Sequence, residues 1–90
     1  MGPIEFNETF RARTKKWTLG IIKWYANIQP RTDEVRILGK QLIRFSSSVA
    51  ANFRAACRAR SKVERYAKFC IVVEESDESL FWMEIFFESE

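Results

Sequence analysis

The fold is decided by residues 63–87, which read VERYAKFCIVVEESDESLFWMEIFF. On a helix through this segment, apolar residues three and four apart form one stripe, and further apolar residues cover the other sides. The stripe contains Val63, Ala67, Cys70, Phe81 and Ile85. A helix that is apolar nearly all round must be enclosed by neighbours. The segment therefore predicts a long helix that needs more cover than two other helices of the same chain can give.

Two breaks divide the rest of the chain into helical segments. Pro30 cannot continue a helix, and Ser61 with Glu64 has the spacing of a capping box. Between these breaks the apolar residues recur at helical spacing, which predicts three long helices over about residues 5–28, 33–59 and 62–88. Long helices joined by short loops predict an all-α, antiparallel up-down bundle, in one domain spanning residues 1–90.

The composition excludes several classes of function. The 90 residues contain no histidine, which removes the commonest metal ligand and the usual general base. Two cysteines are too few for a disulfide scaffold. We therefore expect no enzyme activity, with no catalytic, cofactor or metal site. No apolar stretch is long enough to span a membrane, so the expectation is a cytoplasmic protein with reduced thiols.

Charge is distributed unevenly along the sequence. All 15 lysines and arginines lie in residues 1–68, whereas residues 69–90 contain only acidic charges. A concentrated basic surface attracts phosphate backbones through counterion release, which predicts contact with RNA or DNA. The alternative is that solvated helix faces merely differ in sign. The predicted nucleic-acid-binding residues are Arg36, Lys40, Arg54, Arg58, Arg60, Lys62, Arg65 and Lys68.

Beside the apolar stripe of residues 33–59 runs a polar sector at helical spacing. Antiparallel pairing places Arg44 opposite the acidic residues near position 77, where it could form an ion pair that fixes register. Asn52 is expected to bond across to the third helix near residues 68–69. A catalytic role is the weaker alternative, because no base is available to activate Ser48. This predicted structural network contains Gln41, Arg44, Ser48, Asn52, Asp77 and Glu78.

The end of the third helix is rich in aromatic residues. Contiguous apolar side chains of this kind indicate an interaction surface. We expect another subunit, or a fourth helix, to cover it, and the alternative is an adaptor that docks a foreign helix. The predicted interface residues are Phe81, Trp82, Ile85, Phe86 and Phe87.

Two separated segments resemble a known family. Residues 38–62 contain LGKQLIR, then SSSV, then NFRAACRARSK, and residues 74–84 read EESDESLFWME. Together they resemble the signatures of the "four helix bundle protein" family, which includes proteins encoded in intervening sequences of bacterial 23S ribosomal RNA genes. The resemblance covers about residues 10–87. Two departures are Ala55, where many members have a glutamate, and the fourth helix of the family, which the sequence does not reach.

The resemblance implies a four-helix bundle that assembles as a homopentameric barrel without enzyme activity. It also implies kinship with the accessory proteins of diversity-generating retroelements, which bind nucleic acid and a reverse transcriptase through basic surfaces. The polar positions of the family match Gln41, Arg44, Ser48, Asn52 and Glu78, which we take as structural. The sequence thus predicts a non-enzymatic, self-associating helical scaffold that contacts nucleic acid.

Overall fold

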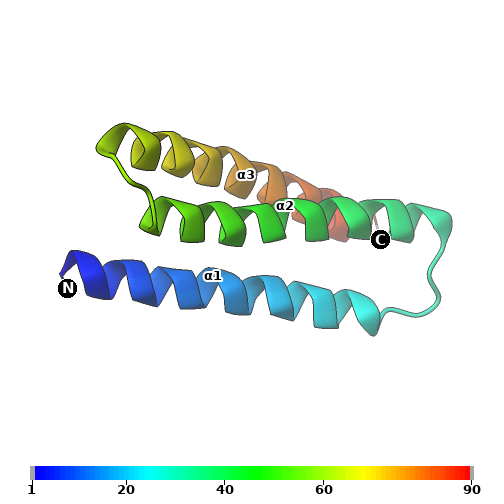
Figure 1. Ribbon diagram of the computed structural model, residues 1–90. Coiled ribbons are helices and arrows are strands. Elements are labelled where there is room, and N and C mark those ends of the chain that lie inside the picture. Colours follow the sequence, from blue (N-terminus) through cyan, green and yellow to red (C-terminus); the bar gives the residue numbers. More distant parts are fainter. Residues whose placement is uncertain (1, 90) are drawn as a thin grey trace.

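The computed structural model describes residues 2–89, and this part of the chain is helical throughout apart from two short connections. The helices are α1 (Pro3–Ala26), α2 (Asp33–Cys57) and α3 (Lys62–Glu88). Figure 1 shows α1 and α2 side by side, with α3 packed against α2. The all-α bundle expected from the sequence is confirmed. None of the described helices combines the length and hydropathy needed to cross a bilayer.

Side chains at the connections explain where α2 and α3 begin. The Thr32 hydroxyl accepts a hydrogen bond from the Val35 N–H at 3.2 Å and caps α2. The Ser61 hydroxyl accepts from the Glu64 N–H at 3.1 Å, and a Glu64 carboxylate oxygen accepts from the Arg60 N–H at 3.3 Å. These bonds satisfy amide groups that a helix start leaves without partners. The capping box expected from the sequence is therefore present.

Two helices end two residues earlier than the sequence predicts. After Cys57, the N–H groups of Arg58 and Ala59 donate to carbonyls three residues back, so the last turn of α2 tightens. At the end of α1, the Arg31 guanidinium donates to the carbonyl of Ala26 at 3.0 Å, and this bond closes the helix before residue 28. The sequence pattern carries no information about such terminal bonds, because they replace the regular ones without changing the apolar period.

The core lies along α2, which packs against both other helices. Among the described residues, no Cα of α1 comes within 8 Å of a Cα of α3. The two outer helices meet through side chains alone, for example where the Trp24 ring lies 4.9 Å from Phe86 and 5.6 Å from Phe87 between centroids. The buried apolar residues of the described chain are Ile21, Leu42, Val49, Phe53, Ala56 and Phe86.

The contact between α1 and α2 is close because small residues lie at it. The Thr18 hydroxyl donates across the seam to the Ser46 carbonyl at 3.0 Å. The Tyr25 ring occupies the space where a Cβ of Gly39 would lie, so glycine is required at this point of α2. The α1–α2 hairpin therefore has one register, with residue 18 opposite residue 46.

The molecule is elongated and leaves α3 poorly covered. Its extents are 45 × 20 × 18 Å, and the Cα radius of gyration is 14.7 Å, against ~12 Å for a compact chain of this length. Only Ser79 and Phe86 of α3 are buried. Val63 is 81% exposed and Val73 is 68% exposed. The helix thus keeps on its surface apolar side chains that its sequence pattern predicts should be enclosed.

Candidate nucleic-acid interface

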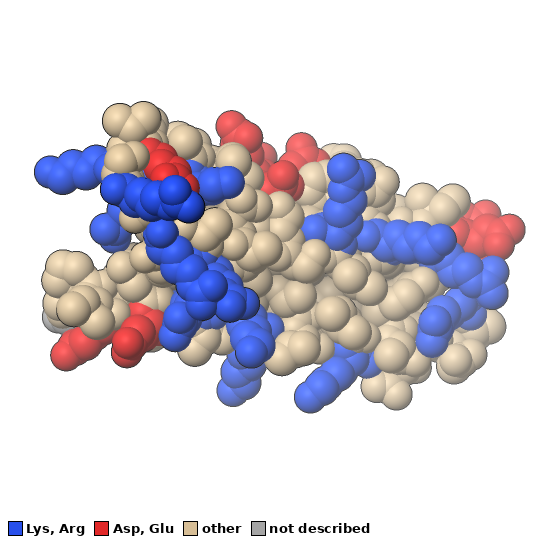
Figure 2. Space-filling model, viewed as in Figure 1, with Lys and Arg blue, Asp and Glu red and all other residues tan. Residues whose placement is uncertain are grey.

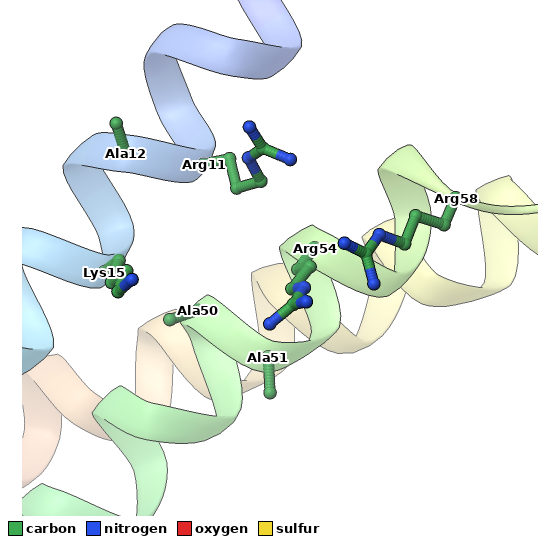
Figure 3. Close-up of a pocket in the computed structure, with 7 residues that line it drawn as sticks. All are labelled: Arg11, Ala12, Lys15, Ala50, Ala51, Arg54 and Arg58. Carbon is green, nitrogen blue, oxygen red and sulfur yellow. The ribbon is translucent and has the colours of Figure 1, made fainter.

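A groove of about 500 Å³ lies between α1 and α2 near the end where α2 passes into α3. Figure 3 shows that both helices contribute cationic side chains to it and that alanines lie between these cations. Because alanine side chains are short, they leave the space between the cations open. The lining residues are Arg11, Ala12, Lys15, Ala50, Ala51, Arg54 and Arg58.

The register of the α1–α2 hairpin places these cations at defined levels. Thr18 bonds to Ser46, and the ring of Phe10 lies 6.3 Å from that of Phe53. Arg11 follows Phe10 and Arg54 follows Phe53, so these two arginines also lie opposite each other. Lys15 lies opposite Ala50, about 6 Å from the arginine level, because one helical step of four residues rises by that distance. The side chain of Arg58 runs back along α2 toward Arg54 (Figure 3).

The four cations of the groove have no acidic partner within the described chain. The one ion pair between described residues joins Arg36 to Asp33 at 3.1 Å, at the far end of α2. Glu8 lines a smaller adjoining hollow with Arg11 and Arg58 but makes no ion pair with either. Like charges held close together raise the electrostatic potential of a concave surface and attract an anion to it.

The structure separates the predicted basic residues into groups. Arg54 and Arg58 line the groove, whereas Arg36 and Lys40 lie on the first two turns of α2. The remaining four surround the turn between α2 and α3 and the first turns of α3. Figure 2 shows one group of lysines and arginines at this end of the molecule and over the adjoining seam, and a second group toward the opposite end. These four are Arg60, Lys62, Arg65 and Lys68.

Arg65 connects this turn to α1. Its guanidinium donates to the Asn7 side-chain oxygen at 3.4 Å and lies 5.5 Å above the Phe69 ring. It therefore links the start of α3 to the start of α1, in addition to adding charge to the basic end.

The nucleic-acid-binding residues predicted from the sequence do not include Arg11 and Lys15, although both line the groove. Lys15 lies four residues from Arg11 on α1, and Arg58 lies four residues from Arg54 on α2. Only the register of the hairpin places Arg11 opposite Arg54 and Lys15 one turn away at Ala50, and Gly39 beneath Tyr25 fixes that register. A helical wheel of one helix does not contain this information.

The predicted polar network forms only in part. The Asn52 amide donates to the Ser48 carbonyl at 2.9 Å and to its hydroxyl at 3.0 Å, within α2 and not across to α3. Arg44 is exposed and lies 5.5 Å from the Phe45 ring; it makes no ion pair with Asp77 or Glu78 in the described chain. Gln41 is half-buried. The bonds predicted from Arg44 and Asn52 across to α3 therefore do not form among the described residues. Asn52 finds its partners within α2, and Arg44 is exposed to solvent.

The acidic residues opposite Arg44 line a hollow of their own. It has a volume of about 480 Å³ and combines one aromatic ring with four carboxylates. Its lining residues are Phe45, Glu74, Glu75, Asp77 and Glu78. The acidic hollow lies between α2 and α3, whereas the basic groove lies between α1 and α2, and no ion pair joins the two among the described residues.

The predicted aromatic interface contains one core residue. Phe86 is only 5% exposed and packs against Trp24, so it belongs to the interior and not to a free surface. Phe81 and Phe87 are about half exposed, and Trp82 and Ile85 are half-buried. An aromatic run on a single helix cannot all point outward, because successive residues lie 100° apart.

Next to these residues an apolar groove runs between α1 and α3 and over the start of α2. It consists of two adjoining hollows of about 700 and 290 Å³, both lined by Trp24 and Phe87. Gly20 lies in the smaller hollow, and a Cβ placed there would meet no atom within 4 Å. The smaller hollow is lined by Trp17, Gly20, Ile21, Trp24, Leu42, Met83 and Phe87.

Metal-ligating side chains do not gather in the described part of the chain, where no group of three or more could hold an ion. Cys57 and Cys70 are both free thiols. Comparison with known proteins finds no family model, no curated sequence and no solved structure that matches the chain.

Proposed function

We propose that the protein is a non-enzymatic, self-associating helical scaffold that contacts nucleic acid through the groove between α1 and α2. The observation that supports this proposal is the set of four cations around one hollow, none of them ion-paired within the described chain. A phosphate backbone binds favourably to such a surface, because each neutralised phosphate releases condensed counterions. The basic turn between α2 and α3 extends the same surface.

Charge reversal tests the proposal directly. The double variant Arg54→Glu/Arg58→Glu should lose salt-sensitive binding to a fluorescent single-stranded oligonucleotide at 100 mM salt. The matched control is Lys16→Glu/Lys23→Glu, which changes net charge by the same amount on exposed positions that lie outside the groove and outside the predicted binding residues. If the two variants lose binding equally, net charge and not the groove attracts the strand, and unchanged binding by the first variant overturns the proposal.

The absence of histidine from the sequence supports a function without catalysis. The Ser48 hydroxyl accepts a hydrogen bond from the Asn52 amide, which is not a base and cannot activate a nucleophile. Two free thiols agree with a reducing compartment, and we therefore propose a cytoplasmic location.

The uncovered sides of α1 and α3 support self-association. The apolar groove between these helices exposes Trp24 and Phe87 to solvent, which is costly for a small domain with few buried residues. By the family resemblance, we propose an up-down four-helix bundle in a homopentamer, in which a further helix or subunit fills this groove. Sedimentation equilibrium should then give a particle of five times the chain mass, and a monomer that stays folded at low concentration contradicts self-association.

A second candidate function is that of a protein–protein adaptor that docks a foreign helix through the aromatic end of α3. The observation that favours it is Gly20, which costs about 1 kcal/mol in a helix interior and meets no side chain within this chain. A glycine on the floor of an apolar groove allows a partner backbone to approach closely. Under this function, binding depends on Trp82 and Phe87 and hardly changes with salt.

A further inference from the structure

We infer that the groove between α1 and α2 holds two consecutive phosphates of one nucleic-acid strand, at two neighbouring subsites. This inference rests on the proposed function and specifies which part of the nucleic acid the groove recognises. It follows from the positions of the four cations along the axes of α1 and α2.

The first subsite is formed by three arginines. Arg11 of α1 lies opposite Arg54, and the side chain of Arg58 runs back toward Arg54 along α2 (Figure 3). Guanidinium groups bind phosphate through two parallel hydrogen bonds each, which a lysine cannot reproduce. No described carboxylate pairs with any of the three, so their donors are free to bind an anion.

The second subsite lies one helical turn away, at Lys15. Its neighbours on α2 are Ala50 and Ala51, whose short side chains leave room for a bound group above the helix. Lys15 therefore supplies a single positive charge over an apolar floor, about 6 Å from the arginine level.

The spacing of the subsites selects the ligand. The two phosphorus atoms of pyrophosphate share one bridging oxygen and lie closer together than one helical turn. Consecutive phosphates of a strand are separated by a sugar, and they can reach both subsites. The groove offers no aromatic platform for a base, so it recognises the backbone and not the sequence.

Binding of a labelled 12-nucleotide thymidine strand between 50 and 200 mM salt tests the inference. Lys15→Gln should make the slope of log affinity against log salt shallower by about 0.7, the value for one phosphate of a single strand. The matched control is Lys16→Gln, the adjacent exposed lysine outside the groove, which should leave the slope unchanged. Arg54→Lys should weaken binding several-fold with the slope unchanged, because charge is kept and the paired hydrogen bonds are lost.

Competition distinguishes a strand from a free diphosphate. A dinucleotide that carries two phosphates should displace the labelled strand at a concentration at least ten-fold lower than inorganic pyrophosphate. Equal competition, or equal effects of Lys15→Gln and Lys16→Gln, overturns the two subsites while the proposed function stands. If the unmodified protein shows no salt-dependent binding to the strand, the proposed function fails and the inference fails with it.

Discussion

The hydroxyl of Thr18 donates a hydrogen bond to the carbonyl oxygen of Ser46 at 3.0 Å and joins α1 to α2 across their seam. Both residues are buried, and Ser46 is fully inaccessible to solvent. This bond lies one turn from the basic groove, since Lys15 and Ala50 line its nearer end. The contact that sets the register of the hairpin therefore also sets which cations face each other.

Thr18→Val should lower the free energy of unfolding by about 1 kcal/mol, because it removes a buried donor while keeping the shape of the side chain. Urea denaturation monitored by circular dichroism measures this. The control is Thr14→Val, whose hydroxyl bonds only to the Arg11 carbonyl on its own helix and should change stability little. If both variants are equally stable, the interhelical bond contributes nothing.

The two glycines in helix interiors should respond in opposite directions to alanine. Gly39→Ala should destabilise the chain by more than 1 kcal/mol, since its Cβ would collide with the Tyr25 ring. Gly20→Ala should stabilise it by about 1 kcal/mol, because alanine is the better helix former and nothing lies in the way. Denaturant midpoints of the two variants measure the difference.

The same Gly20→Ala variant separates helix propensity from association. If a partner backbone packs against this glycine, the variant should associate more weakly although each chain is more stable. Sedimentation at several concentrations measures the association. An unchanged dissociation constant shows that the groove at Gly20 receives no closely packed helix.

Substitutions of the aromatic residues at the end of α3 should affect either stability or association, according to how deeply each side chain is buried. Phe86→Ala should lower the free energy of unfolding by about 3–5 kcal/mol, as expected when a large ring is removed from a core. Because a loss of that size can unfold a small domain, Phe86→Leu is the milder variant and should cost less. Phe81→Ala, at a half-exposed ring, should leave chain stability nearly unchanged and weaken association. Equal thermal midpoints for Phe86→Leu and Phe81→Ala contradict the placement of Phe86 in the core.

The Ser61 cap at the start of α3 should contribute about 1 kcal/mol to the free energy of unfolding. Ser61→Ala removes the acceptor for the Glu64 N–H and leaves that donor without a partner. Ser76→Ala, at an exposed position within α3, is the control and should be neutral or slightly stabilising, because alanine favours helix. Thermal unfolding of the two variants provides the comparison, and equal losses show that the cap has no specific role.

The sequence predicts the helices well because their signals are local. Pro30, the Ser61–Glu64 capping box and the apolar period place all three helices, with errors of two residues at the ends of α1 and α2. The acidic and basic halves of the chain are also evident from the sequence. Each of these features depends only on residues that are close together along the chain.

Only part of the basic groove can be predicted from the sequence, because the groove depends on how the helices pair. Arg11 and Lys15 gain their role from the residues opposite them, and Phe86 becomes a core residue only because Trp24 packs on it. Arg44 shows the reverse case. The antiparallel pattern predicts an ion pair with Asp77, but an exposed guanidinium has no need of one, since water solvates it well.

The most direct test of the basic groove is a map of amide chemical shifts in the protein as a single-stranded oligonucleotide is added. We expect the largest changes at Ala12, Ala50 and Ala51, which line the basic groove, with loss of these changes at high salt. Changes confined to the aromatic end around Trp82, or changes that persist at high salt, would contradict it.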